Sequence, residues 1–160
     1  MNNEIRIKHA TGKVTKTIVG RLLPGTDLIT GIEEICKENG IKYGSIETCF
    51  GSFYRSGYLY LEPIEGAKLG VGYTDINHVE GPVEFLGATG LICQREGDYE
   101  VHIHGTMCDK TGKVFGGHLV KGENPALGTV DLVINEIEGV EILRTYDEYS
   151  DSYQTEPRQL

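Results

Sequence analysis

Residues 99–119 read YEVHIHGTMCDKTGKVFGGHL and contain two alternating runs separated by a turn. In the first run, apolar residues alternate with His102 and His104, which is the period of a strand with one buried face. Between the runs, residues 109–113 begin with aspartate and carry Gly112 where a three-residue hairpin loop needs a left-handed residue. The stretch therefore predicts an antiparallel hairpin.

This loop also predicts which residues of the two strands face each other. Pairing Asp109 with Lys113 sets His104 directly opposite His118. His102 then lies on the same face, about 7 Å away along its strand. A two-residue loop would instead turn His118 to the other face. We expect three neighbouring imidazoles.

Three neutral imidazoles are a common ligand set for zinc, and a fourth position left open is typical of catalytic sites. We therefore predict a metal site on His102, His104 and His118, holding zinc or another divalent transition metal. Gly116 and Gly117 leave room beside the rings for a water or a small ligand. Two alternatives stay open: the histidines pack or bind metal only structurally, or they bind nothing.

The rest of the chain has the pattern of a mainly antiparallel sheet. Its 22 glycines fall between short runs of apolar and β-branched residues, which is typical of strands joined by tight turns. The predicted strands are Val14–Leu23, Ser45–Phe50, Ser56–Leu61, Val83–Gln94, Tyr99–Cys108, Lys113–Val120, Thr129–Glu136 and Val140–Tyr146.

One amphipathic helix interrupts this pattern. Leu28, Ile32, Ile35 and Cys36 recur at helical spacing, with Thr26 or Asp27 as the N-cap and Asn39-Gly40 as a left-handed stop. Residues 64–80 show neither period and predict a long loop. The sequence thus indicates a single α/β domain of the α+β kind over residues 1–146, followed by a polar, loosely held tail over 147–160.

Composition limits the partners and the location. The net charge of −9 and the pI near 5.0 oppose contact with DNA and with anionic membranes. No apolar run is long enough to span a bilayer, and the N-terminus does not resemble a signal peptide, so we expect a cytoplasmic protein. The four cysteines are scattered and predict free thiols in a reducing compartment.

Six short motifs, in order, resemble the PPC domain family, also labelled DUF296, of plant AT-hook nuclear proteins and stand-alone prokaryotic proteins. The resemblance runs from about Val14 to Tyr146 and implies an α/β fold assembled as a homotrimer. The AT-hook that links plant members to DNA has no counterpart in this chain. The motifs are Arg21-Leu-Leu-Pro-Gly-Thr-Asp-Leu28, Asn39-Gly-Ile41, Gly51-Ser52, Gly81-Pro-Val-Glu-Phe-Leu86, Val101-His-Ile-His104 and Gly116-Gly-His-Leu119.

The fold this family implies is similar to that of acetolactate decarboxylase, which holds zinc on three histidines. By that resemblance the three histidines would be the ligands in this chain too. A lyase or hydrolase would also need an acid or base and an anion-binding residue. The candidates are Glu84 and Glu47 for the acid or base and Arg55 or Arg21 for the anion; each is alternatively a surface or intersubunit charge.

Two functions follow as hypotheses. The first is a small trimeric protein with zinc on three histidines, acting as a metal-dependent lyase or hydrolase on a small molecule. The second is a DNA-associated or regulatory oligomerisation module without catalysis. The sequence names no substrate.

Overall fold

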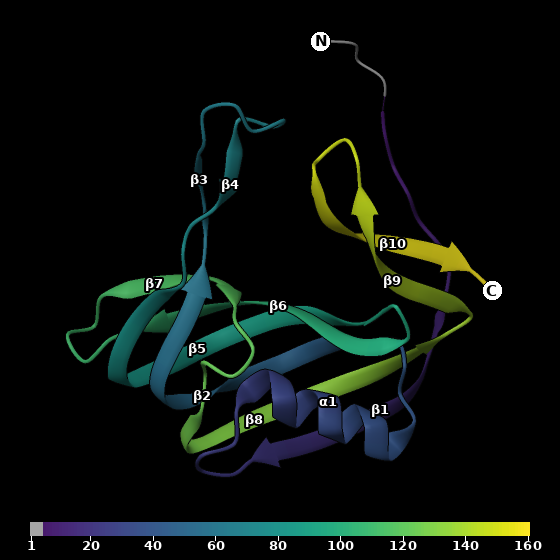
Figure 1. Cartoon of the computed structure of the whole chain (residues 1–160). Coiled ribbons are helices and arrows are strands. Elements are labelled where there is room, and N and C mark those ends of the chain that lie inside the picture. The colour runs from purple at the N-terminus through teal and green to yellow at the C-terminus, as the bar shows by residue number, and fades with distance from the viewer. Residues whose placement is uncertain (1–4) are drawn as a thin grey trace.

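Within residues 5–160, alternating strand patterns build one large twisted sheet, and a single helix lies against it (Figure 1). The computed structural model describes residues 5–160. Eight strands follow the spatial order β1-β8-β2-β7-β6-β5-β9-β10 and are mainly antiparallel. Their bounds are β1 Lys13–Leu22, β2 Gly44–Leu59, β5 Asn77–Arg95, β6 Asp98–Cys108, β7 Val114–Leu119, β8 Ala126–Glu138, β9 Val140–Asp147 and β10 Ser152–Gln159. The α+β class with one main helix is confirmed.

Strand β2 differs from the sequence prediction, which ended one strand at Phe50 and began another at Ser56. The structure has one strand of 16 residues, with irregular register near Gly51 and between Phe53 and Arg55. The glycine and serine residues therefore bend the strand without ending it. Because of this bend, β2 pairs first with β8 and β5 and then, at Leu59, with His118 of β7.

The helix α1 (Leu28–Asn39) begins and ends where the capping residues predict. Asp27 is the N-cap and accepts a hydrogen bond from the backbone nitrogen of Thr30 at 3.0 Å. Gly40 ends the helix in the left-handed region, with a φ of 68°. The apolar face of the helix is buried with the inner side chains of the sheet, among them Ile103 and Met107 of β6.

Two segments were predicted wrongly as irregular. Residues 64–80 are not one long loop, since they hold part of a projecting two-stranded arm, β3 (Leu61–Pro63) and β4 (Val71–Tyr73), and the start of β5 (Figure 1). Residues 147–160 are not a loose tail, since β10 pairs along its whole length with β9. Both segments are rich in polar residues or glycine, so their own patterns are weak, and pairing with a neighbour orders them.

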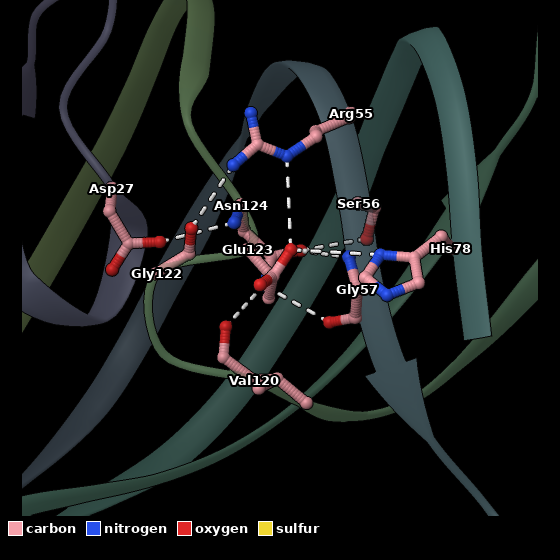
Figure 2. A network of polar contacts seen from close by, with 9 residues as sticks. All are labelled: Asp27, Arg55, Ser56, Gly57, His78, Val120, Gly122, Glu123 and Asn124. Atoms are coloured by element: carbon pink, nitrogen blue, oxygen red, sulfur yellow. Dashed lines mark hydrogen bonds and ion pairs between the residues drawn. The ribbon is translucent and has the colours of Figure 1, made fainter. Parts of the chain in front are cut away.

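A buried asparagine fixes the loop that follows β7 (Figure 2). The side chain of Asn124 accepts a hydrogen bond from Ser56 at 2.7 Å and donates to the carbonyl of Val120 at 2.8 Å. Its backbone nitrogen donates to the helix cap Asp27 at 3.1 Å. The end of β7, which carries His118, is thus tied both to β2 and to the helix.

The four cysteines are free, as expected. Burial raises the pKa of Cys36, Cys49 and Cys93 to about 12, so these thiols stay protonated at neutral pH. Within residues 5–160, the single helix is too short and too polar to cross a membrane.

Candidate metal centre

The hairpin β6–β7 has the predicted loop and register. The backbone nitrogen of Asp109 donates to the carbonyl of Lys113 at 3.1 Å, and Gly112 has a φ of 80°. His104 pairs directly with His118 across the two strands. The three-residue loop, which sends His118 to the face of His104, is therefore confirmed.

The three histidines converge on the outer face of the sheet. Their ring centroids lie 5.1 to 5.2 Å apart in all three pairs. One ring nitrogen from each can be chosen so that all three atoms lie within 4.8 Å of one another. The Nε2 atoms of His102 and His104 are 3.2 Å apart. Such a cluster of nitrogens can share one cation.

Burial keeps these imidazoles neutral. It lowers the pKa of His102 to about 4, with a further lowering by the positive charge of Arg144. Burial, with a smaller contribution from His104, lowers the pKa of His118 to about 4 as well. The pKa of His104 is also lowered, again mainly by burial. Neutral imidazoles offer the lone pairs that a metal needs.

The donor set fits a borderline metal such as zinc. Nδ1 of His118 is buried and finds no hydrogen-bond partner among the described residues. Leaving a buried ring nitrogen unpaired is unfavourable, and a cation bound at this nitrogen would relieve it. Three imidazoles on a rigid hairpin therefore suit a site of this kind.

A cavity of about 350 Å³ opens beside His102 and His118. It lies between the arm β3–β4 and the hairpin β9–β10, which rise from the same side of the sheet (Figure 1). Tyr73 of the arm stacks near His118 at 5.6 Å between ring centroids, and Lys68 donates to the carbonyl of Glu148 at 2.6 Å. The two hairpins thus touch, and both line the cavity, whose lining includes Arg95, Glu100, Arg144 and Tyr153.

Glu100 is a carboxylate at this site that the sequence analysis did not select. It lies on β6 two residues before His102 and therefore shares the outer face with the histidines. Its Oε1 accepts from Nε of Arg144 at 3.2 Å, and its Oε2 lies 3.7 Å from Arg95. The same alternation that grouped the histidines would have identified it. No local pattern identifies Arg144, which reaches the site from β9.

The residues predicted to accompany the metal lie elsewhere. Glu84 is exposed on β5 and pairs with Cys108 of β6. Cys108 is four residues beyond His104 on the same strand, so Glu84 lies away from the histidines. Glu47 is exposed on β2 and accepts a hydrogen bond from Ser45 at 2.8 Å. Neither lines the cavity beside the histidines.

Arg55 belongs to a separate network (Figure 2). Its Nε lies 3.8 Å from Glu123, and its Nη2 donates to the carbonyl of Gly122 at 3.4 Å. Glu123 also lies 3.6 Å from Nδ1 of His78. This network includes the loop after β7 and does not line the cavity beside the histidines.

Comparison with known proteins agrees with the motifs. The sequence profile of the Plants and Prokaryotes Conserved (PCC) domain, the family abbreviated PPC above, matches residues 9–138. Comparison with curated proteins gives no match.

Solved structures share the fold over nearly the whole chain. A plant- and prokaryote-conserved (PPC) protein from Pyrococcus horikoshii is 26% identical, with a TM-score of 0.77 over 94% of this chain and 97% of that one. A metal-containing protein from Archaeoglobus fulgidus is 24% identical, with a TM-score of 0.77 over 94% and 99%. A Bacteroides thetaiotaomicron protein described as a candidate DNA-binding protein is 21% identical, with a TM-score of 0.72 over 91% and 96%.

Proposed function

Because the chain belongs to the Plants and Prokaryotes Conserved domain family, we propose that it is a homotrimeric metalloprotein that holds zinc, or another divalent transition metal, on His102, His104 and His118. Its action is that of a metal-dependent lyase or hydrolase on a small molecule. The observation that carries the proposal is the convergence of three neutral imidazoles beside an open cavity of about 350 Å³.

When bound, such a metal supplies a Lewis acid or lowers the pKa of a coordinated water. The chain's own residues have complementary tasks in the proposal. Glu100 is the carboxylate nearest in sequence to the histidines and lies on the same face, so it would accept or return a proton within the cavity. Tyr73 and the hairpin β9–β10 narrow the entrance and limit water.

Metal analysis of protein purified without an affinity tag tests the site. We expect about one metal ion per chain in the unaltered protein, and loss of that ion in His104→Ala and in His118→Ala. His9→Ala is the matched control, because His9 is exposed and far along the chain from the cluster. Near-stoichiometric metal that survives the substitution of His104 or His118 would contradict the proposal.

The trimer and the compartment belong to the same proposal and rest on the family. Light scattering tests the assembly, and a clean monomer at micromolar concentration would contradict it. The four free cysteines suit a reducing compartment, which supports the cytoplasmic location.

A DNA-associated role is the second candidate, favoured by the Bacteroides thetaiotaomicron neighbour described as a candidate DNA-binding protein. The charge of −9 opposes it. A gel-shift titration against duplex DNA at moderate salt distinguishes the two candidates. Tight binding that weakens steeply with salt would favour the second candidate over the first.

A further inference from the structure

Arg144 of β9 lies next to His102, one of the three clustered histidines. Its side chain is only 10% exposed. Its Nη1 lies 3.2 Å from Nδ1 of His102 and 3.3 Å from Oγ1 of Thr155, while its Nε donates to Glu100 at 3.2 Å. Arg144 therefore contacts one of the proposed ligands on the side away from the cluster, and it also lines the cavity.

The hydrogen atoms of this contact restrict the tautomer of His102. A guanidinium only donates, so Nδ1 of His102 accepts from Arg144 and the hydrogen of the neutral ring sits on Nε2. Nε2 is the atom that faces His104, at 3.2 Å. Binding of a cation at Nε2 needs the lone pair there and moves the hydrogen to Nδ1. Arg144 and His102 would then present two donors to each other.

The contact between Arg144 and His102 is therefore incompatible with a cation held at Nε2 of His102. Arg144 keeps its bonds to Glu100 through Nε and to Thr155 through Nη1, but Nη1 loses its second acceptor, Nδ1 of His102. Within residues 5–160, Nη2 of Arg144 donates no hydrogen bond. The free edge of the guanidinium needs a new acceptor, and the adjoining space is the 350 Å³ cavity.

Charge indicates that this acceptor is an anion. The charged groups that line the cavity are Arg95, Arg144 and Glu100, and with neutral histidines they sum to one positive charge. A divalent cation raises that sum to three, in a chain whose net charge is −9. An excess of positive charge around one cavity favours the binding of an anion there.

The shape of the lining favours a carboxylate over a phosphate. Glu100 already occupies one edge of Arg144, so a single donor edge remains, which matches the planar fork of a carboxylate. Every lining residue comes from a strand or a strand end, so no helix N-terminus supplies the converging N–H groups typical of phosphate sites. Leu59, Tyr73 and Tyr153 offer apolar surface to a short carbon skeleton.

Resting on the proposed function, we propose that the ligand of this site is a small organic carboxylate and that Arg144 binds its carboxylate group once the metal has released the arginine from His102. Metal and carboxylate therefore bind cooperatively, and Arg144 couples them. The residue lies on β9, beyond residues 9–138 that the family profile matches.

Cobalt(II)-loaded protein and glycolate test the coupling, because the visible spectrum of cobalt reports both its binding and any change in its coordination. We expect glycolate to bind the loaded protein at least about tenfold more tightly than the metal-free protein. Glycolamide, which lacks the charge, and inorganic phosphate should bind more weakly than glycolate.

The variant Arg144→Gln is the decisive test, because its affinity for glycolate and its affinity for cobalt should change in opposite directions. Glycolate affinity should fall about tenfold or more, because a charged hydrogen bond is lost. Cobalt affinity should rise severalfold, because neither the opposing charge nor the contact with Nδ1 of His102 remains. A merely structural role for Arg144 would weaken both. Arg158→Gln, an exposed arginine of the same hairpin, is the matched control and should change neither.

The outcomes separate this inference from the proposed function. Unaltered protein that binds no cobalt overturns both. Cobalt that binds while glycolate does not, or glycolate binding that Arg144→Gln leaves unchanged, overturns the carboxylate and keeps the metal site. Should Arg144→Gln fail to fold, Arg144→Lys keeps the charge and loses the fork, and unchanged glycolate binding in that variant contradicts the inference.

Discussion

The hairpins β6–β7 and β9–β10 both contribute to the histidine site, but they are anchored differently. On β6, Ile103 and Met107 are fully buried in the main core. The hairpin β9–β10 lies at the edge of the sheet, and its buried apolar residues, Val140 and Ile142, belong to a second cluster with Cys93. The proposed metal ligands thus sit on a rigid hairpin, whereas the cavity wall sits on a lightly anchored one. Such a wall can change without unfolding the domain.

The largest expected effect tests the rigidity of β6–β7. In Gly116→Ala, the added methyl group would lie 2.2 Å from the backbone carbonyl oxygen of Gly105 on the paired strand. Because backbone atoms cannot move aside without breaking the strand pairing, we expect a loss of about 5 kcal/mol in the free energy of unfolding. Urea denaturation followed by circular dichroism measures it.

Gly128→Ala on β8 is the control for that substitution. Its methyl group would meet only Oγ of Ser52, at 3.5 Å, which is an ordinary contact. We expect a change within about 0.5 kcal/mol. Equal stabilities of the two variants would show that β6–β7 tolerates separation of its strands, and the contrast between the hairpins would fail.

The next largest effect compares the two clusters of buried residues directly. Ile103→Ala should destabilise the protein by about 4 kcal/mol and Ile142→Ala by about 2 kcal/mol, because the larger core collapses less readily around a lost side chain. Both residues are at least nine-tenths buried, at 0% and 6% exposure, so exposure alone does not separate them. The two denaturation midpoints provide the measurement, and a reversed order would contradict the anchoring argument.

Low pH should destabilise the metal-free protein by favouring protonation of the histidines on β6–β7. The folded pKa of His102 and of His118 is about 4, against an ordinary value of 6.5. Between these values the unfolded chain binds more protons than the folded protein, so the stability of metal-free protein is complete above pH 6.5 and falls as the pH drops toward 4. Because both rings are partly exposed and interact, we expect a loss on the order of 2 kcal/mol.

Denaturation of metal-free protein at pH 7, 5.5 and 4.5 measures this loss. The double variant His102→Asn with His118→Asn is the reference, because the carboxylates that also titrate in this range are common to both proteins. The variant should lose less stability than the unaltered protein over the same interval. Parallel curves for the two proteins would show that these histidines titrate normally.

The contrast between the hairpins also explains what could be predicted from the sequence. The register of His104 opposite His118 follows from five consecutive turn residues, so local chemistry was sufficient. The position of Arg144 depends on the pairing of β9 with β5, in which Leu143 lies opposite Gln94. These two residues are some fifty positions apart, so no local sequence pattern predicts the pairing. The strand β10 was missed because its polar residues show no alternation and pairing alone orders them.

The smallest expected effects come from the two turns, which use the same device. Asp109 accepts hydrogen bonds from the backbone nitrogen and the hydroxyl of Thr111, at 2.8 and 2.6 Å. Asp147 does the same for Ser150, at 2.8 and 2.7 Å. In each case the hydrogen bonds to the hydroxyl and backbone nitrogen lower the pKa of the aspartate. Replacing either aspartate with alanine should lower Tm by a few degrees, with the larger change for Asp109 because its loop joins strands of the main core.

Ligand binding should separate these two variants more clearly than Tm does. Asp109→Ala loosens the loop that sets His104 opposite His118, so metal affinity should fall while the shape of the cavity wall is kept. Asp147→Ala loosens the turn of β9–β10, so metal affinity should stay the same and glycolate affinity should fall. Metal titration and glycolate titration on both variants measure this crossed pattern. If Asp147→Ala weakened the metal as much as Asp109→Ala, the two hairpins would form one mechanical unit, and the division between ligand support and cavity wall would be wrong.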